Sequence, residues 1–510
     1  MLGLQSSLTK AKGIKAYDST NSLRFVPDDD FIRIADHADF NHVTSSVSYF
    51  TVSLWFKHDD GSPRENESLM SKYDSGADKR EWRISIDSND KIVVVISDDG
   101  DVGSIITNVS TFVVDDTDWH HLYFRYDGSK TEEEQRVFMT VDGTQVLGQD
   151  GGASNVGTPS ATNYAELYNG IEAGTTGADV VIGGFLNNND AYSVMFDGRI
   201  DEVCYWDGHF YKTDSITAAK YIYNNGNPRD MRYAGGGTAQ ANTSLIGYWK
   251  MGEFYNGGAS VPDGTFPTST TNPMGTTAYS GGAGGYPLIA LNYAGGSPKR
   301  TGSNLVRNGD FSTAITECAV DEANNGVAGT SGTDWYAGHS SNVGHTVTND
   351  TSVYYNAGRS IKLVTGANDN HCFINQTTDT NLVDGAFYVF EFWWRTSTDT
   401  SDSGSESWGR CQFELDQCIE GDAQYGLSGD GNLGTTYSTI NKWHRIIQVG
   451  KYNAGSNNNE GIQLARNLGN SSNLAKTYWF DNISLWKLTG SHHGVFVSSN
   501  VVAYQEGVDL

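Results

Sequence analysis

The sequence of 510 residues has little proline, few basic residues and no long apolar run. Its nine prolines stand against 59 glycines, which favours a turn-rich β protein. Without an apolar stretch of about 18 residues, a membrane-spanning helix is excluded. The 34 lysines and arginines are outnumbered by 61 aspartates and glutamates, giving a net charge of −27. A surface this acidic repels nucleic acid and anionic membranes, so neither is expected as a partner.

Cysteine is also sparse, and the sequence contains no C-x-x-C pair. The five cysteines are Cys204, Cys318, Cys372, Cys411 and Cys418. Four of them lie in the last 200 residues, so one or two disulfides there stay open. The first residues, M-L-G-L-Q-S-S-L-T-K-A-K, lack the charged and then apolar order of a secretory signal. Because no export signal is expected, free buried thiols are the default prediction.

The chain is instead rich in aromatic residues, at 12%, and in short alternating segments. T-V-S-L-W-F-K (51–57) and E-W-R-I-S-I-D (81–87) alternate apolar and polar residues, as half-buried strands do. R-V-F-M-T-V-D-G (136–143) alternates in the same way and ends in Asp-Gly, a tight-turn signal. D-S-I-T-A-A-K-Y-I-Y-N-N-G (214–226) has helical spacing, and Gly226 is its stop signal.

The order of these segments predicts an all-β protein with two β-sandwich (jelly-roll) domains and one short helix near 214–226. A Gly/Ser/Thr-rich stretch indicates a linker or irregular loop between the sandwiches. The expected parts are an N-terminal arm (1–21), a first sandwich (22–252), the linker (253–303), a second sandwich (304–489) and a C-terminal tail (490–510).

Two adjacent histidines in D-W-H-H-L-Y-F-R-Y-D-G (118–128) raise the question of a metal site. The residues that follow them alternate as in a strand. Because neighbouring strand residues point to opposite faces, His120 and His121 cannot easily hold one ion. A structural role is therefore predicted for both.

Several motifs of the first half point to one family. F-T-V-S-L-W-F-K (50–57), W-H-H-L-Y-F-R-Y-D-G (119–128) and F-D-G-R-I-D-E-V-C-Y-W (196–206) resemble a laminin-G-like, concanavalin A-like lectin domain in order and spacing. After the helix, N-N-G-N-P-R-D-M (224–231) and L-I-G-Y-W-K-M-G-E (245–253) look like the version found in tail and virion proteins of bacterial viruses. This resemblance implies a place on the surface of a bacteriophage particle.

The second half resembles a carbohydrate-binding-module jelly roll over residues 304–488. N-L-V-R-N-G-D-F (304–311), G-R-S-I-K-L (358–363) and Y-W-F-D-N-I-S-L (478–485) stand in the order of that family. The resemblance implies that each half folds as its own sandwich.

A structural calcium is implied by the same resemblance. In such modules an acid at the position of Asp481 helps to hold the ion with groups near the first strand, here Asn308 and Asp310. Carboxylate and carbonyl oxygens are the ligands that calcium takes. A role for Asp481 in capping the backbone is the alternative.

Asp201 and Glu202 pose a similar question in the first half. Adjacent strand residues point to opposite faces, so one of the two is expected to face inward. A buried ion pair with Arg199 or Arg125 is the first prediction, and a metal site is the alternative.

For catalysis, the best candidate is F-E-L-D-Q-C-I-E (413–420), where Glu414 and Asp416 share one strand face. Paired carboxylates are what glycosidases use. Glu420 falls too late for the spacing of the sandwich glycosidases, so no enzyme activity is predicted.

Sugar binding requires exposed aromatic rings, because the C–H face of a sugar stacks on them. Trp408, Tyr425 and Tyr336 lie in polar, loop-like surroundings and are the predicted platforms. Trp335 falls where the resembled module keeps a core tryptophan.

These observations predict a non-enzymatic structural accessory protein of a bacteriophage particle, such as a fibre, spike or decoration protein. Its lectin-like domains would attach to host-surface glycans through many weak copies. Other virion proteins and sister subunits in a homo-oligomer are the expected partners. The alternatives are a cement protein that binds no sugar, a bacterial surface adhesin and a polysaccharide depolymerase.

Overall fold

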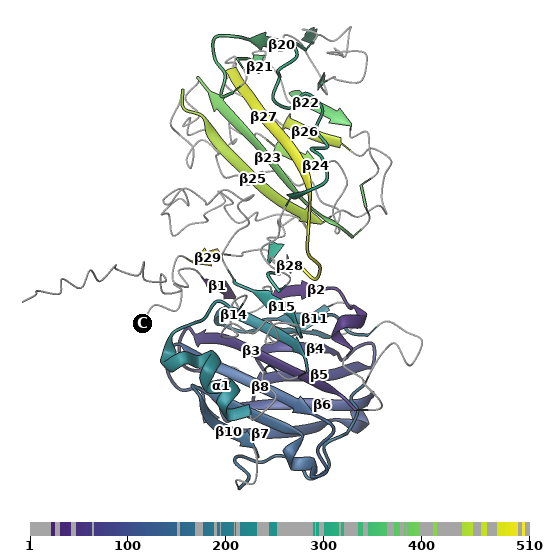
Figure 1. The fold of residues 1–510 in the computed structure, drawn as a ribbon, viewed down its shortest axis with the longest axis vertical. Coiled ribbons are helices and arrows are strands. Elements are labelled where there is room, and N and C mark those ends of the chain that lie inside the picture. The colour runs from purple at the N-terminus through teal and green to yellow at the C-terminus, as the bar shows by residue number, and fades with distance from the viewer. Residues whose placement is uncertain are drawn as a thin grey trace, which may run out of the picture.

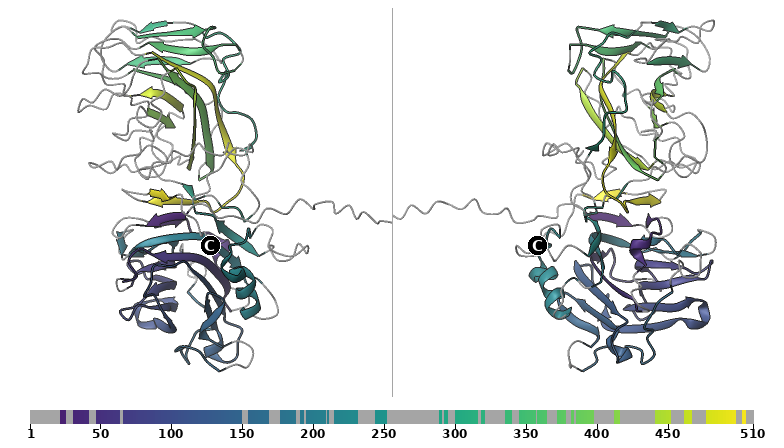
Figure 2. Two further views of the ribbon diagram at one scale, coloured as in Figure 1. Left: turned by 90° about the vertical axis from the view of Figure 1, so that its left-hand side faces the viewer. Right: turned by 45° about the vertical axis from the view of Figure 1, so that its right-hand side comes forward.

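The structure, a computed structural model, shows two β-sandwiches stacked along the long axis (Figures 1 and 2). It describes residues 22–25, 31–41, 47–63, 66–149, 154–168, 177–187, 191–193, 195–208, 210, 215–231, 244–251, 289–290, 292–294, 300–315, 318–320, 335–339, 345–356, 358–364, 372–377, 382–383, 385–397, 412–415, 441–451, 461–466, 477–497 and 502–504. In these ranges the predicted all-β class is confirmed, and no helix is long and apolar enough to cross a bilayer.

The first sandwich consists of two sheets. One has the order β10-β9-β8-β3-β14-β1-β29, with β15 beside β14. Its strands are β1 (Ser22–Phe25), β3 (Tyr49–His58), β8 (His120–Asp127), β9 (Val137–Val141), β10 (Thr144–Gly148), β14 (Gly198–Asp207), β15 (Leu245–Trp249) and β29 (Val502–Tyr504). The other has the order β16-β28-β2-β11-β4-β5-β6-β7, with β12 beside β4 and β13 beside β12. Its strands are β2 (Phe31–Ile34), β4 (Ser68–Asp74), β5 (Lys79–Ile86), β6 (Lys91–Gly100), β7 (Ile106–Val113), β11 (Val180–Ile182), β12 (Phe185–Asn187), β13 (Ala191–Ser193), β16 (Ile289–Ala290) and β28 (Gly494–Val497).

The alternating segments build the core between these sheets. The inward residues of β3 and β5 are fully buried: Val52, Leu54, Phe56, Trp82, Ile84 and Ile86. Phe50 stacks on Trp82 with ring centroids 5.0 Å apart. Full burial of each such side chain stabilises the fold by roughly 1.5 to 3 kcal/mol. Because this gain comes from the apolar face of each strand, the alternating pattern predicted the two layers.

A helix covers the outer face of the first sheet. The helical elements are α1 (Ser215–Tyr223) and the short 3-10 helices η1 (Ala38–Phe40), η2 (Val102–Ser104), η3 (Glu133–Gln135) and η4 (Asn224–Gly226). Ala218, Ala219 and Ile222 of α1 share an apolar cluster with Tyr123 of β8 and Trp206 of β14. As a result, these two strands are buried on both faces.

The adjacent histidines lie on opposite faces of β8, as predicted. His120 Nδ1 lies 2.7 Å from Asp142 Oδ2, and its Nε2 lies 2.9 Å from Asp116 Oδ1. The buried His121 points toward the helix side, where its Nε2 lies 2.8 Å from Ser53 Oγ. The two rings therefore have separate structural roles.

The second sandwich also consists of two sheets. One has the order β18-β20-β21-β27-β23-β25, with β17 beside β27, and the other has the order β19-β22-β26-β24. The strands of the first are β17 (Arg300–Thr301), β18 (Cys318–Val320), β20 (His345–Asp350), β21 (Ser360–Val364), β23 (Phe387–Thr396), β25 (His444–Lys451) and β27 (Thr477–Leu488). Those of the second are β19 (Tyr336–His339), β22 (Cys372–Thr377), β24 (Gln412–Leu415) and β26 (Gly461–Arg466). Trp335 is fully buried beside Phe311, as the resemblance implied.

The end of the chain returns to the first sandwich. β28 pairs with β2, with Phe496 opposite Ile32, and β29 pairs with β1, with Ala503 opposite Leu23. Each sheet of the first sandwich thereby gains a strand, so for the described residues of 490–510 the expectation of a tail is replaced by two built-in strands. The edges of β1 and β2 offer unpaired backbone groups that these strands satisfy. Within the expected linker, β16 and β17 also pair with strands, β28 and β27.

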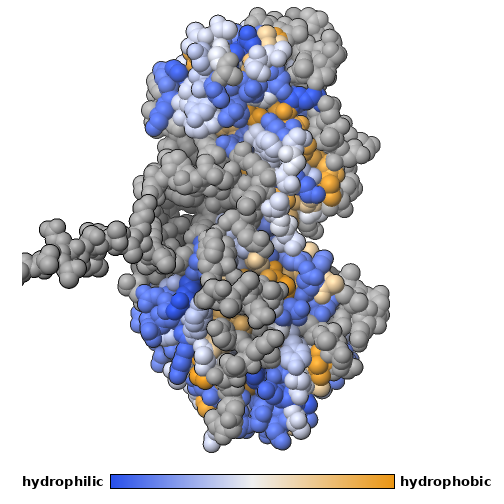
Figure 3. All heavy atoms as spheres, viewed as in Figure 1, coloured by the Kyte–Doolittle hydropathy of each residue, from blue (hydrophilic) through white to orange (hydrophobic). Residues whose placement is uncertain are grey.

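One apolar cluster joins the two sandwiches. Phe387 and Val389 of β23 and Leu488 of β27 lie in the same cluster as Tyr248 of β15 and Tyr293. Because this apolar surface is removed from water only when the sandwiches are in contact, the cluster couples their stabilities. Among the residues that are coloured in Figure 3, most on the visible face are hydrophilic, in agreement with the net charge of −27.

The described cysteine side chain is that of Cys204, which is buried and free. The side chains of the other four cysteines lie outside the described residues. The predicted arm (1–21) and most of the predicted linker lie outside them as well.

Candidate functional site

Three aromatic residues form an aromatic surface on the second sandwich, namely Tyr355, Trp393 and Trp443, and Tyr354 directly precedes Tyr355 in the chain. Tyr354 and Tyr355 are 46% and 42% exposed, and they are the only aromatic residues among the large apolar side chains exposed in the described ranges. The Tyr355 ring lies face to face with Trp393, with centroids 3.8 Å apart and planes 15° apart. Trp443 approaches Tyr355 edge-on, with centroids 6.1 Å apart.

The pleat of β23 places Trp393 on the outside of its sheet. Its neighbours Phe392 and Trp394 point inward and are almost completely buried, whereas Trp393 is partly exposed. Across the ladder, Trp393 lies opposite Arg445 of β25 and Asp481 of β27. The ring is therefore fixed by a central strand and is presented to solvent.

The two tyrosines come from the loop between β20 and β21. At the start of the loop, the Oδ1 of Asp350 accepts hydrogen bonds from the amides of Ser352 (2.8 Å) and Val353 (3.0 Å). Ser360, at the start of β21, donates its hydroxyl to the Val353 carbonyl at 2.6 Å. These turn contacts order the backbone that carries the tyrosines.

The predicted calcium ligand Asp481 holds the same loop. Its side chain is fully buried, and its Oδ2 accepts hydrogen bonds from the amides of Tyr355 (2.7 Å) and Asn356 (2.9 Å). Its Oδ1 accepts the Asn482 amide at 2.7 Å. Burial raises the pKa of Asp481 to about 6, against the opposing effect of these three amides, and the charge of Asp310 raises it further. The contacts are those of the backbone-capping alternative.

The other two predicted calcium residues lie in a nearby turn. Asp310 Oδ1 accepts the amide and hydroxyl of Ser312, at 3.1 and 3.0 Å. The side chain of Asn308 exchanges two hydrogen bonds with the backbone of Thr313. In the described ranges, no group of three His, Cys, Asp or Glu side chains with converging ligand atoms includes Asp481. Calcium at this place stays a prediction.

A polar row lies beside the aromatic surface on the same sheet. Trp479 of β27 is flanked across the ladder by Lys362 of β21 and Arg395 of β23. Lys362 Nζ and the Arg395 guanidinium lie 5.7 and 5.6 Å from the Trp479 ring centroid. The Trp479 indole N–H donates to Asp350 Oδ2 at 2.8 Å. Although burial opposes it, hydrogen bonds from Ser352, Trp479 and backbone amides lower the pKa of Asp350 to about 2.

The predicted sugar platforms fall mostly outside the described residues. Trp408 and Tyr425 lie outside them, and for Tyr336 only the backbone in β19 is described, paired with Asn375 of β22. Sequence reasoning missed Tyr354 and Tyr355. The available signal was their position as adjacent aromatic residues in the turn-forming stretch D-T-S-V-Y-Y-N (350–356).

The predicted ion-pair residues lie on β14. Asp201 and Glu202 are both buried, whereas one of them was expected to face inward. Glu202 has a φ of 49° at a break in the pairing of β14 with β3, and this bulge interrupts the alternation. Glu202 Oε2 accepts a hydrogen bond from the Tyr248 hydroxyl, and Arg199 Nε lies 4.0 Å from Asp59 Oδ1. An ion pair of Arg199 with either acid stays a prediction.

The carboxylates considered for catalysis lie on the small sheet of the second sandwich. Glu414 is placed in β24 opposite Gln463 of β26, and its side chain is outside the described residues. Asp416 and Glu420 are outside them entirely.

Residues 30–214 match the family model of the concanavalin A-like lectin/glucanases superfamily, which confirms the resemblance over most of the first sandwich. No curated protein matches the sequence. A heptameric SAP-like pentraxin from Limulus polyphemus is 13% identical over 41% of this chain and 83% of its own, with a TM-score of 0.28. A putative carbohydrate-binding protein from Bacteroides ovatus is 15% identical over 45% of this chain and 51% of its own, with a TM-score of 0.29. A family 16 carbohydrate-binding module is 13% identical over 27% of this chain and 84% of its own, with a TM-score of 0.18.

Proposed function

We propose that the chain binds a carbohydrate through the aromatic surface of its second sandwich. The observation that carries the proposal is the exposed ring of Tyr355 stacked on Trp393. The C–H face of a sugar packs on such rings, and their burial in a complex gives affinity at little entropic expense because both rings are already held. Lectin-type sandwiches such as the one matched by residues 30–214 are compatible with this role.

The polar row narrows the class of sugar. Lys362 and Arg395 place two cationic groups beside the aromatic surface of a chain whose net charge is −27. A guanidinium binds carboxylates in a bidentate manner. A polysaccharide that contains uronic acids fits this combination of rings and cations.

The biological setting is proposed from the sequence resemblance of residues 224–231 and 245–253. In this setting the chain is a non-enzymatic accessory protein on a bacteriophage particle, and it attaches to host-surface polysaccharide. Many copies on one particle would turn weak single-site binding into firm attachment. Immunogold labelling of purified particles tests the location, independently of sugar binding.

Affinity electrophoresis of the full chain in gels with alginate, which carries uronic acids, or with neutral dextran tests the binding. We expect alginate to retard the protein more than dextran does. Tyr355→Ala and Trp393→Ala should each weaken binding about 2- to 12-fold, because a ring contact is worth about 0.5 to 1.5 kcal/mol. Tyr221→Ala, on α1 of the other sandwich, is the matched control.

Three outcomes separate the alternatives. Equal retardation of all variants would refute the aromatic surface as the binding site. Release of reducing ends from alginate would indicate a depolymerase. The absence of retardation in either gel, together with firm association with particles, would favour a cement protein.

A further inference from the structure

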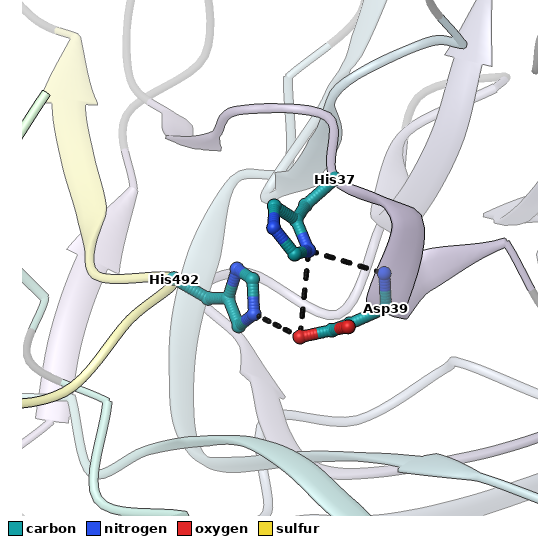
Figure 4. Close-up of side chains that lie close together, drawn as sticks. All are labelled: His37, Asp39 and His492. Carbon is teal, nitrogen blue, oxygen red and sulfur yellow. Dashed lines mark hydrogen bonds and ion pairs between the residues drawn. The ribbon is translucent and has the colours of Figure 1, made fainter.

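Two histidines and an aspartate from distant parts of the chain meet at the edge of the first sandwich (Figure 4). His37 and Asp39 belong to η1 and its N-cap, after β2, and His492 lies in the connection from β27 to β28. His492 Nε2 lies 2.8 Å from Asp39 Oδ2, and His37 Nδ1 lies 3.4 Å from the same oxygen. The two imidazole rings have centroids 4.6 Å apart.

We propose that His37, Asp39 and His492 bind a divalent transition metal ion of the zinc type. One ligand atom from each side chain lies within 4.8 Å of the other two. Bonds of about 2.0 to 2.2 Å in a tetrahedral zinc site place ligand atoms roughly 3.3 Å apart, so small side-chain movements suffice. Two imidazoles and one carboxylate favour zinc and its neighbours over calcium, which takes oxygen ligands.

Neighbouring residues hold the third ligand, His492, in place. The His492 side chain is only 7% exposed, and the edge of its ring packs on Phe40 with centroids 4.8 Å apart. Its backbone carbonyl accepts the indole N–H of Trp249 at 3.0 Å.

The other two ligands leave the site open to solvent, since the His37 and Asp39 side chains are 53% and 51% exposed. A fourth position is thus available to water. His37 Nδ1 at present accepts the Asp39 amide at 3.1 Å. An imidazole nitrogen has a single lone pair, so metal binding must replace this hydrogen bond or use Nε2 after rotation of the ring. Because zinc binding must break this hydrogen bond or rotate the ring, we expect a moderate affinity for zinc.

A bound ion would fasten the returning end of the chain to the first sandwich. His492 lies two residues before β28 (Gly494–Val497), which pairs with β2, and η1 begins four residues after the end of β2. The ion would therefore connect the two segments that flank this strand pair.

Zinc titration of the untagged full chain, followed by calorimetry, tests the site. We expect one zinc ion per chain and a rise in melting temperature, whereas calcium at the same concentration should give neither through this site. Cobalt should give the intense visible absorption of a tetrahedral complex. His37→Asn and Asp39→Asn should each weaken zinc binding at least tenfold, and both residues are exposed enough for the fold to persist.

The matched control is Asp60→Asn. Asp60 lies 3.0 Å from His58 Nδ1 with the same H-x-D spacing, but the third neighbour there is Glu67 instead of a second histidine. Zinc affinity should be unchanged in this variant. A zinc affinity that is the same in the wild type, His37→Asn and Asp39→Asn would overturn the proposal, as would the absence of zinc binding.

Discussion

The buried carboxylate of Asp481 holds the backbone of Tyr355, with its Oδ2 2.7 Å from the Tyr355 amide nitrogen. This contact spans 126 residues of the chain and joins the middle of β27 to an exposed loop. A related arrangement occurs in the first sandwich. Asp201 accepts the amide of Glu202 at 2.8 Å as Asp481 accepts that of Asn482, and the residue after each aspartate has a φ near 50°. In both strands an aspartate stabilises a bulge in a central strand.

Replacement of Asp481 by alanine should loosen the loop that carries Tyr355. Three backbone amides would lose their acceptor, and each buried, unpaired amide costs about 1 to 3 kcal/mol. With partial relaxation, we expect a loss of about 2 to 4 kcal/mol in the free energy of unfolding, measured in urea, and weaker retention by alginate.

Asp310→Ala is the control, because Asp310 is exposed and its hydrogen bonds go to Ser312. Its stability should change little. The opposite outcome is that Asp310→Ala and a calcium chelator both lower the melting temperature as Asp481→Ala does. In that case the capping role of Asp481 does not by itself explain the loss of stability, and calcium is bound.

The pKa values of the two adjacent histidines are shifted in opposite directions, so the two residues should affect stability at opposite ends of the pH range. Burial alone would lower the pKa of His120, but hydrogen bonds and charges from Asp142 and Asp116 outweigh it and raise this pKa above 6.5. His120 therefore adds stability that is complete below pH 6.5 and is lost as the pH rises through its folded pKa. Burial lowers the pKa of His121 to about 3. The unfolded chain then binds a proton that the folded chain excludes, so stability falls as the pH drops from about 6.5, by at most about 1.4 kcal/mol per pH unit.

Urea unfolding between pH 4 and 8 measures both effects. His121→Gln should flatten the acid side of the profile, and His120→Asn should flatten the alkaline side. Identical profiles for the two variants would contradict the opposite environments of the rings.

The sequence predicted those parts of the fold in which many neighbouring residues obey one period. β3, β5 and α1 were found because burial of one face repeats over several residues, as Leu54 and Ile84 illustrate. β28 and β29 have four and three residues, too few to show a period, and their role depends on strands far away in the chain. The exposure of Tyr355 likewise depends on the distant Asp481, which no local pattern contains.

Phe387 should couple the two sandwiches thermally. It lies in the apolar cluster shared with Tyr248 of the first sandwich and with Tyr293. Truncation of a buried phenylalanine to alanine typically costs 3 to 5 kcal/mol. We expect calorimetry to show one main transition for the wild type and two separated transitions for Phe387→Ala. Phe392→Ala, whose ring is buried within the second sandwich, should lower the stability of that sandwich without this splitting. The same splitting in both variants, or in neither, would show that the cluster plays no part in the coupling.

Removal of the returning strands should destabilise the first sandwich, although it begins more than 450 residues earlier in the chain. A chain that ends after Leu488 lacks β28 and β29 and the contact of His492 with Trp249. Each lost hydrogen bond should lower the free energy of unfolding by about 0.5 to 1.5 kcal/mol. The melting temperature of the truncated chain should therefore fall by about 5 to 10 °C. The exposed edges of β1 and β2 should also promote association, visible as a larger species in size-exclusion chromatography. A chain that ends after Tyr504 keeps both strands and should behave like the full chain. Equal melting temperatures for the two truncations would show that the first sandwich is complete without its C-terminal strands.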